Sequence, residues 1–321
     1  MKRLLFSLLT LILISPSAFA WNDKGHMVCS RLAWKQLSAE ERTKITKILQ
    51  NHPHYKEYLA ANRPDNIPED EWAFMRASTW ADWVRNGPPE RKAYNRGEWH
   101  YINIPYIPPG EDIKAPGAGE QNVVKQIGLS KKIVLSGGDR VEQAVHLTWL
   151  FHLITDMHQP LHCCTRFSKE FPEGDRGGNL SKVKLQSGGL IQLHSFWDGL
   201  LGRDVNNAGI NSGVLDLEKQ LEVNGGKIRD ELDRHKTVEE WAQESFQQAV
   251  KCVYLSGDLK VVYAKTEFRD GEVKILDDEK KIEIPIAPKY YAQQAGDCAR
   301  YQATKAGLRL SIVLKEIAAA N

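Results

Sequence analysis

One long, largely apolar segment with a histidine and an aspartate one helical turn apart constrains the fold of this chain more than any other feature. Residues 141–157 read VEQAVHLTWLFHLITDM, a pattern typical of a helix buried on most of its surface. His152 and Asp156 are four residues apart and therefore share one face of this helix. Burying an ionised carboxylate is costly unless it is paired or bound to a metal. The pattern predicts either a metal site or a polar network in which His152 belongs to the core.

The rest of the chain is mainly helical in pattern. Apolar residues at helical spacing predict further helices over residues 26–37, 38–49, 195–205, 237–255 and 295–320. Ser38 and Glu41 form a capping-box pattern at the start of the second of these. We therefore expect a mainly α fold.

Two stretches depart from the helical pattern. Residues 180–197 predict two short strands around Ser187-Gly188-Gly189. Residues 259–284 alternate apolar and polar side chains around Asp270-Gly271, which is a hairpin signal. No repeat or linker divides the chain, so we expect one helical domain over residues 21–321 with short β-hairpin insertions.

The first twenty residues have the features of an export signal. Two basic residues precede an apolar run over residues 4–14, and Ala18-Phe19-Ala20 has the small-x-small pattern that signal peptidase reads. A membrane anchor is the alternative, but this run is shorter than the ~20 residues that cross a bilayer. We expect residues 1–20 to be a signal peptide, and the mature chain to be secreted or periplasmic, without a membrane anchor, and to begin at Trp21.

Net charge and cysteine content restrict the classes of function. The formal net charge is +2, and Lys2 and Arg3 account for all of it, so the mature chain is formally neutral. Neutrality argues against a basic surface for duplex DNA but leaves single strands open, because aromatic stacking can carry much of their binding. The chain has five cysteines, and an exported chain can form disulfide bonds, but sequence alone does not give the pairing.

Further histidines resemble metal ligands in type and spacing. His194 and Asp198 repeat the spacing of four, and His162 lies just past the proline that ends the long helix. His235 and Glu239 have the same spacing, but one such pair is expected by chance. Histidine and carboxylate side chains supply the nitrogen and oxygen ligands that zinc accepts.

Six short motifs carry a resemblance to a known family. They are WNDKGH at 21–26, STWADWVR at 78–85, WHYIN at 99–103, FHLITDMHQPLH at 151–162, GGN at 177–179 and LHSFWD at 193–198. In this order they closely resemble the zinc-dependent single-strand nucleases of fungi and plants, which share a scaffold with bacterial zinc-dependent phospholipase C. The resemblance implies that this chain has the helical fold of these enzymes. It also implies that the chain hydrolyses single-stranded DNA and RNA to products with 5′-phosphates. We also expect a monomer.

The resemblance implies three zinc ions. The first would be bound by the free amine and carbonyl oxygen of Trp21 and by His26, with Asp156 bridging to the second. The remaining ligands would be Asp82, His100 and His152 on the second ion, and His162, His194 and Asp198 on the third. Each of these positions has the required residue type. Zinc would lower the pKa of water and neutralise charge on the leaving oxygen.

Four more positions match residues that contact substrate in this family. Arg85 would stabilise the phosphate, although an ordinary surface arginine is the alternative. Tyr101 would stack on a base, or would be a core tyrosine. Asn179 of the GGN motif would line the site, because the two glycines allow the backbone to approach a ligand closely. Asn103 replaces an aspartate of the fungal enzymes, and since an amide cannot act as a base, base preference and pH optimum are in doubt.

Two rival functions remain. Phospholipase C typically has a glutamate at the position of Asp198, and its HSFWD equivalent differs from the one found here. A secreted zinc-binding protein without activity would have lost ligands, and no expected ligand is lost in this chain.

Overall fold

The computed structural model describes residues 21–263, 266–269, 272–275 and 286–321. The expected signal peptide and the turn Asp270-Gly271 lie outside the described residues. The helices are α1 (Asp23–Gln36), α2 (Ala39–Leu49), α3 (Glu69–Ala77), α4 (Trp80–Trp83), α5 (Pro89–Lys92), α6 (Val123–Leu135), α7 (Arg140–Met157), α8 (Leu193–Asp198), α9 (Asn207–Arg234), α10 (Val238–Gln248) and α11 (Tyr291–Ala320). The expected mainly α fold is confirmed.

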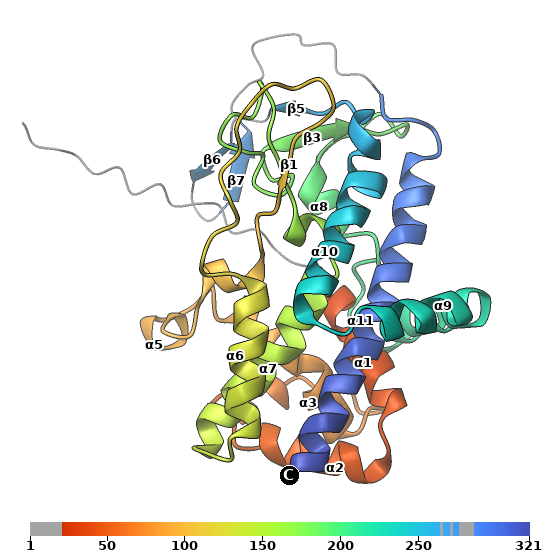
Figure 1. Cartoon of the computed structure of the whole chain (residues 1–321). Helices are drawn as coiled ribbons and strands as arrows, with labels where there is room; N and C mark the ends of the chain where they lie inside the picture. Colours follow the sequence, from red (N-terminus) through yellow and green to blue (C-terminus); the bar gives the residue numbers. More distant parts are fainter. Residues whose placement is uncertain (1–20, 264–265, 270–271, 276–285) are drawn as a thin grey trace, which may run out of the picture.

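Helix α7 is central to the packing. It contacts α2, α6 and α11, and every residue from 147 to 157 is buried (Figure 1). Large side chains surround it, with Trp149 packed edge-on against Trp80. A helix that is enclosed on all sides holds its polar groups away from water. The sequence prediction for this helix is therefore confirmed, and the side chains of His152 and Asp156 lie inside the molecule.

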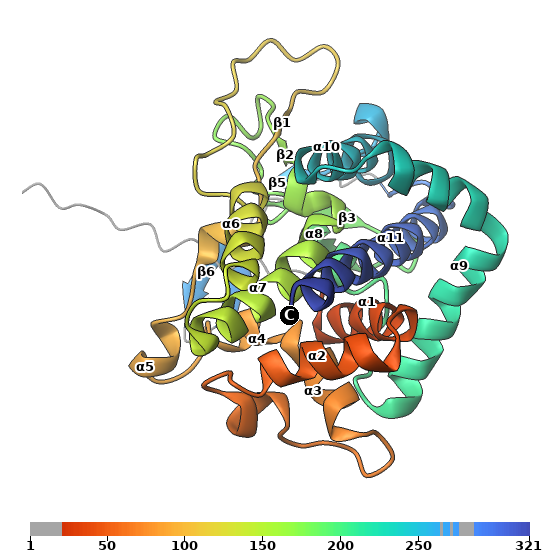
Figure 2. The same ribbon diagram turned by 60° about the horizontal axis from the view of Figure 1, so that its bottom comes forward.

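The helices on either side of α7 build the rest of the core. Helix α1 packs against α11, α9 and α3. The long helix α9 lies on the outside and curves past α1 and α11 (Figure 2). The capping box of Ser38 and Glu41 is present at the start of α2, as predicted.

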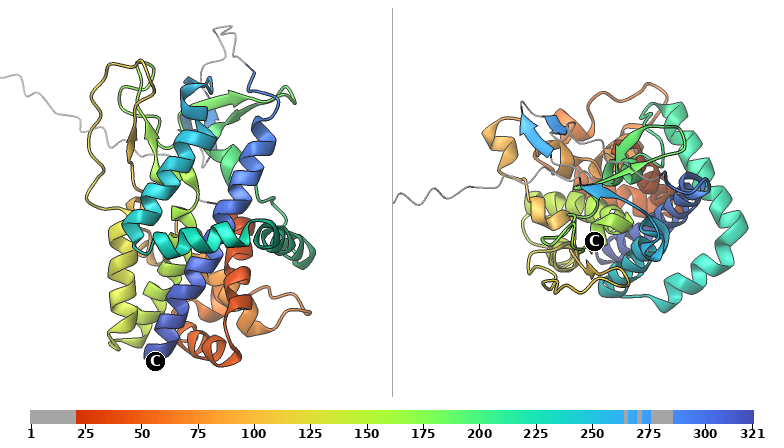
Figure 3. Two further views of the ribbon diagram at one scale, coloured as in Figure 1. Left: turned by 45° about the vertical axis from the view of Figure 1, so that its right-hand side comes forward. Right: turned by 90° about the horizontal axis from the view of Figure 1, so that it is seen from above.

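Short strands gather at one end of the helices (Figure 3). Strands β3 (Ser181–Lys184) and β4 (Leu190–Gln192) pair antiparallel, and β5 (Val262–Tyr263) pairs with β3 on its other edge. Strands β6 (Thr266–Arg269) and β7 (Glu272–Ile275) form the second predicted hairpin. Strands β1 (Pro105–Tyr106) and β2 (Thr165–Arg166) form a parallel pair.

Two helix predictions need correction at their ends. The segment predicted as a helix over 195–205 is helical only as α8, because Gly199 caps it and Gly202 adopts a left-handed φ of 89°. The segment predicted over 237–255 is α10 followed by a π-helical turn over Ala249–Val253. The early end of α8 lets the backbone carbonyl of Asp198 accept a hydrogen bond from the Asn22 amide, 3.3 Å away.

Among the described residues, none of the helices combines the length and the apolar content that crossing a membrane requires. All five cysteines are free thiols in the structure. The sulfurs of Cys252 and Cys298 both lie near the side-chain oxygen of Gln248, at 3.4 and 3.6 Å. Disulfide pairing of this chain stays a prediction.

Candidate metal centre and its flanking pockets

Helix α7 places two of the predicted metal ligands side by side. Nε2 of His152 lies 3.0 Å from Oδ2 of Asp156, one helical turn away. His100, at the end of a short helical turn over Gly97–His100, brings its Nδ1 to 2.9 Å from the same oxygen. Both histidines and the aspartate are buried. Together they form one group able to hold a metal ion.

His26 and Asp82 join this group from α1 and α4. Nε2 of His26 lies 3.3 Å from Oδ1 of Asp156, the carboxylate oxygen that does not face His152. Oδ1 of Asp82 lies 3.8 Å from Nε2 of His152. His26, Asp82 and His152 form a second group that could hold a metal. The two oxygens of Asp156 thus face different groups, as a bridging ligand would.

His162, His194 and Asp198 form a third group, as the resemblance implies. Nε2 of His194 lies 3.6 Å from Oδ2 of Asp198, one turn apart on α8. The rings of His162 and His194 have centroids 5.1 Å apart. All three side chains are buried. His235 and Glu239 take no part, and His235 instead faces Glu244 at 3.3 Å.

Hydrogen bonds fix the orientation of the imidazoles. Nδ1 of His152 donates to the carbonyl of Ser78, Nδ1 of His162 to that of His100, and Nδ1 of His194 to that of Gly177, at 2.7, 2.7 and 2.6 Å. In each ring this leaves Nε2 to act as a ligand. Nδ1 of His26 contacts the Thr155 hydroxyl, which has the same effect. Sequence spacing did not identify the acceptors Ser78 and Thr155.

The fit to a metal can be judged from unpaired atoms and spacing. Three buried side-chain atoms of the described ligands lack a hydrogen-bond partner: Nε2 of His26, Nε2 of His100 and Oδ1 of Asp156. Such orphaned groups are costly unless a bound ion satisfies them. Two ligands of one tetrahedral zinc lie about 3.3 Å apart, since zinc–nitrogen and zinc–oxygen bonds are roughly 2.0–2.2 Å. The His26–Asp156 and His194–Asp198 separations of 3.3 and 3.6 Å are close to this value, so the donor set fits zinc.

The electrostatics of the centre favour ionised carboxylates beside histidines. Burial raises the pKa of Asp156, yet His152 and His162 outweigh this effect and hold it well below its usual value. Burial lowers the pKa of His100 to about 3, with a further contribution from Arg85. Asp198 differs, because burial raises its pKa well above the usual value. A carboxylate of this kind needs a cation to stay ionised.

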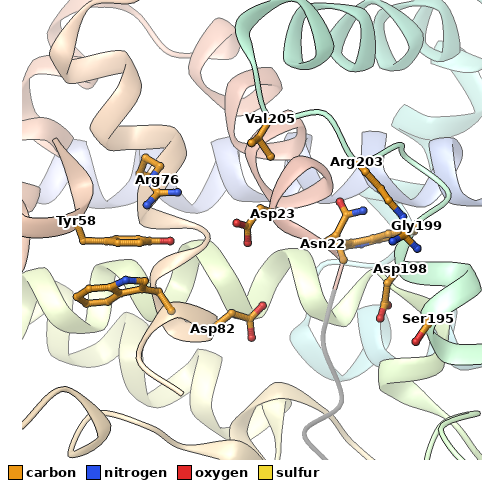
Figure 4. Close-up of a pocket in the computed structure, with 12 residues that line it drawn as sticks. Asn22, Asp23, Tyr58, Arg76, Asp82, Ser195, Asp198, Gly199, Arg203 and Val205 are labelled. Atoms are coloured by element: carbon orange, nitrogen blue, oxygen red, sulfur yellow. The ribbon is translucent and has the colours of Figure 1, made fainter. Parts of the chain in front are cut away.

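Trp21 lies beside the centre. Its side chain is fully buried, and it lines a pocket of about 580 Å³ together with Asp82 and Asp198. The next residue, Asn22, caps α1 through its side chain and donates its backbone amide to Asp198. The start of the predicted mature chain is therefore held at the edge of the candidate metal centre (Figure 4).

Arg85 lies at the centre and is not an exposed surface arginine. Its Nη2 atom is 3.0 Å from Oδ1 of Asp82, one helical turn before it, and its side chain is buried. Arg85 also lowers the pKa of Asp82 against the effect of burial. A guanidinium held beside ligand carboxylates is suited to contact a phosphate at the same place.

Tyr101 and Asn103 line a second pocket of about 280 Å³. Tyr101 is partly exposed, so the structure does not place it as a core tyrosine. Oδ1 of Asn103 accepts a hydrogen bond from the Thr165 hydroxyl at 2.7 Å, which leaves the amide nitrogen to donate elsewhere. Glu98 and Glu120 also line this pocket and make it acidic.

Asn179 belongs to a tight loop that orients His194. Its amide nitrogen donates to the carbonyl of Arg176 at 2.8 Å, and it lines neither of the two pockets. Gly177 and Gly178 have left-handed φ values of 61° and 78°. A Cβ at Gly177 would lie 2.5 Å from the carbonyl oxygen of Leu161. The glycines therefore permit the close packing that directs the Gly177 carbonyl to His194.

Two polar residues that sequence reasoning missed support the centre. Gln159 donates from Nε2 to Oδ1 of Asp198 at 2.8 Å. Asp175 is buried and accepts hydrogen bonds from the hydroxyls of Ser181 and Tyr254 and from the Arg166 amide, which anchors the loop before the GGN motif. Gln159 lies within a motif already singled out, whereas Asp175 gave no spacing signal.

The chain was compared with known proteins. A family model described as S1/P1 nuclease matches residues 21–319, which include every predicted site residue. A search of curated proteins found no match.

Proposed function

We propose that this chain, which belongs to the S1/P1 nuclease family and is therefore a metal-dependent hydrolase of phosphodiester bonds, cuts single-stranded DNA and RNA and leaves 5′-phosphates. One observation carries the proposal. Eight buried side chains from distant parts of the sequence converge in three adjoining groups suited to metal, and Arg85 lies against one of them. Removal of a 3′-phosphate from nucleotides is a second reaction that the same centre would support.

The proposal assigns three zinc ions to the side chains of these groups, divided as the family resemblance implies. His26 and Trp21 would hold one ion, Asp82, His100 and His152 the second, and Asp156 would bridge the two. His162, His194 and Asp198 would hold the third. When bound, zinc lowers the pKa of water and stabilises negative charge on the phosphate and on the leaving oxygen.

The side chains of the protein would supply binding and orientation. Arg85 would donate to the phosphate from a position fixed by Asp82, and a guanidinium beside developing charge stabilises the transition state. Tyr101 would stack on the base of the nucleotide whose 3′ oxygen leaves. The free amide nitrogen of Asn103 would donate to an acceptor on the edge of that base. An unpaired strand can place a base in this pocket, whereas a duplex keeps its bases stacked.

Export of the chain is part of the proposal. Cleavage after Ala20 would free the amine of Trp21, and a free amine can bind zinc whereas a backbone amide nitrogen does not. The mature enzyme would act outside the cytoplasm as a monomer. Two preparations test this role: protein beginning at Trp21 and protein with one added glycine before it. We expect the extended protein to have less zinc and far lower activity, and equal turnover by both would contradict the amine ligand.

One assay separates the proposal from its rivals. Purified mature protein is loaded with zinc, its zinc content is measured, and it is given single-stranded DNA, RNA, duplex DNA and phosphatidylcholine vesicles. We expect three zinc ions per chain and fast cleavage of the single strands alone. Hydrolysis of phosphatidylcholine instead would indicate a phospholipase C. Full zinc occupancy without cleavage of any substrate would indicate an inactive zinc-binding protein.

A further inference from the structure

Unlike the pocket that contains Tyr101, the pocket that contains Trp21 is lined by arginines. Arg76 and Arg203 both line it, whereas glutamates line the Tyr101 pocket. Figure 4 shows the two arginines on opposite sides, with Asp23 between them. Asp82 and Asp198 complete the wall next to the candidate metal centre. The Trp21 pocket therefore adjoins the candidate metal centre through Asp82 and Asp198, and its remaining charged residues are Asp23 and the two arginines.

Arg76 is held rigidly at the edge of this pocket. Its Cζ atom lies 3.8 Å from the centre of the Tyr58 ring, which stacks in turn on Trp83 with centroids 4.4 Å apart. Arg91 covers the far face of Trp83 at 4.0 Å. Trp83 therefore lies between Tyr58 and Arg91, and Tyr58 lies between Trp83 and Arg76. Neither ring has a free face on which a base could stack. Their role is to fix the guanidinium of Arg76.

The guanidinium of Arg76 has no hydrogen-bond acceptor among the described residues. Its Nε atom is buried without a hydrogen-bond partner, and no acidic side chain forms an ion pair with it in the part of the chain that the structure describes. Asp23 faces the same space but is not paired with Arg76 among those residues. A fixed and unpaired arginine beside a pocket is suited to bind an anion. Arg203 is exposed on the loop after α8 and can reach the same anion from the other side.

We propose that this pocket binds the next phosphate of the substrate strand, on the 3′ side of the bond that is cut. The inference rests on the proposed function, in which the base on the 5′ side enters the acidic pocket beside Tyr101. The scissile phosphate then lies at the centre, and the strand continues past Asp82 towards Arg76 and Arg203. The enzyme would thus prefer a strand with at least one further nucleotide on the 3′ side of the cut.

Two trinucleotides test this directly. In both, the linkage at the 5′ end is an ordinary phosphodiester, which can be cut. In the first trinucleotide the linkage on the 3′ side of the cut is a neutral methylphosphonate. In the second this linkage is an anionic phosphonate with a methylene group in place of the 3′ oxygen, which keeps the negative charge and offers no P–O3′ bond to cut. Length, bases, position of the cut and leaving group are the same, so the ratio of the two kcat/KM values reports the need for negative charge on the 3′ side. We expect the first to be cut about tenfold more slowly than the second, as loss of a charged hydrogen bond implies.

Substitution of the arginines should remove this difference. In Arg76→Gln and Arg203→Gln, we expect the tenfold ratio between the two trinucleotides to fall towards one. Arg203 is exposed on a loop, so its substitution tests the proposal even if Arg76→Gln loses the stack on Tyr58 and fails to fold. Arg229→Gln, on the exposed side of α9, is the matched control and should keep the wild-type ratio.

Two results would overturn the subsite. One is a ratio near one in the wild-type enzyme, and the other is a wild-type ratio in both arginine variants. Failure of the proposed function has a different signature, because the enzyme would then cut neither trinucleotide nor longer single strands, and the basis for the subsite would be lost with it.

Discussion

Replacement of Asp156 by asparagine tests the architecture of the metal centre most directly. The carboxylate oxygens of Asp156 face different partners, with Oδ1 3.3 Å from His26 and Oδ2 3.0 Å from His152. Asparagine has the same shape, but its nitrogen is a donor that cannot bind a cation. If Asp156 bridges two ions, both lose a ligand in Asp156→Asn. We expect zinc content after dialysis to fall from about three ions to about one, because the His162 group keeps its ligands.

Asp198→Asn is the matched control. Asp198 belongs to one group only, so this variant should lose one ion. Each ion present at a hundred times its Kd stabilises the fold by about 2.7 kcal/mol. The expected loss is therefore about 5 kcal/mol for Asp156→Asn and about half of that for Asp198→Asn. In a domain of this size these losses correspond to Tm decreases of about 10 and 5 °C in zinc-containing buffer.

The assay combines zinc analysis with thermal unfolding of the two variants and the wild type. Circular dichroism at low temperature checks that each variant is folded. The bridging role is refuted if Asp156→Asn loses no more zinc than Asp198→Asn. It is also refuted if the two variants have the same decrease in Tm when zinc is saturating.

Three other perturbations have defined outcomes. Treatment with EDTA should abolish cleavage of single-stranded DNA and lower Tm, and added zinc should restore both, as activity measurements and calorimetry would show. Burial raises the pKa of Glu244, but Lys305 and Arg309 outweigh this effect and lower the pKa from the usual 4.5 to about 2. The ionised carboxylate therefore stabilises the folded protein above pH 4.5, and this stabilisation is lost as pH falls towards 2. Glu244→Gln should therefore be less stable at pH 7 by about 3–5 kcal/mol and change less between pH 5 and 2, and a parallel pH profile of Tm in both proteins would contradict this. Gly177→Ala should lower the free energy of unfolding by about 1–3 kcal/mol, because its φ is 61° and the new Cβ meets the Leu161 carbonyl. It should also reduce zinc binding by the group that contains His194. Gly189→Ala has open space around the new Cβ and should change the urea unfolding curve little.

Local signals in the sequence were sufficient to predict several elements. The capping box of α2 and the apolar pattern of α7 depend on neighbours within a few residues, and both are confirmed. Helix α9 was missed because its buried side chains are few and it contains glycines, which are poor helix formers. The need for glycine at position 213 is evident only in the fold, because a Cβ there would lie 2.6 Å from the side chain of Val28 in α1. Glycine thus allows α9 to approach α1 closely.

The residues of the candidate site were predicted on different kinds of evidence. His152 and Asp156 follow from helical spacing, whereas His26, Asp82 and His100 were assigned only through the family resemblance. The orienting acceptors are backbone carbonyls, as at Ser78, which carry no side-chain signature in a sequence. Arg76 and Tyr58 form their stack across eighteen positions of loop and helix, so only the fold brings them together.

Burial of α7 connects the stability of the fold with the chemistry of the centre. The packing that encloses residues 147–157 also removes water from Asp156, whose carboxylate lies close to the rings of His26, His100 and His152. Without metal, the carboxylate must be balanced by a proton on the histidines, and Asp156 and Asp82 raise the pKa of His152 against the effect of burial. A bound zinc ion would take the place of this proton and balance the same charge. The apolar core therefore favours cation binding, because it removes the water that would otherwise solvate the carboxylate.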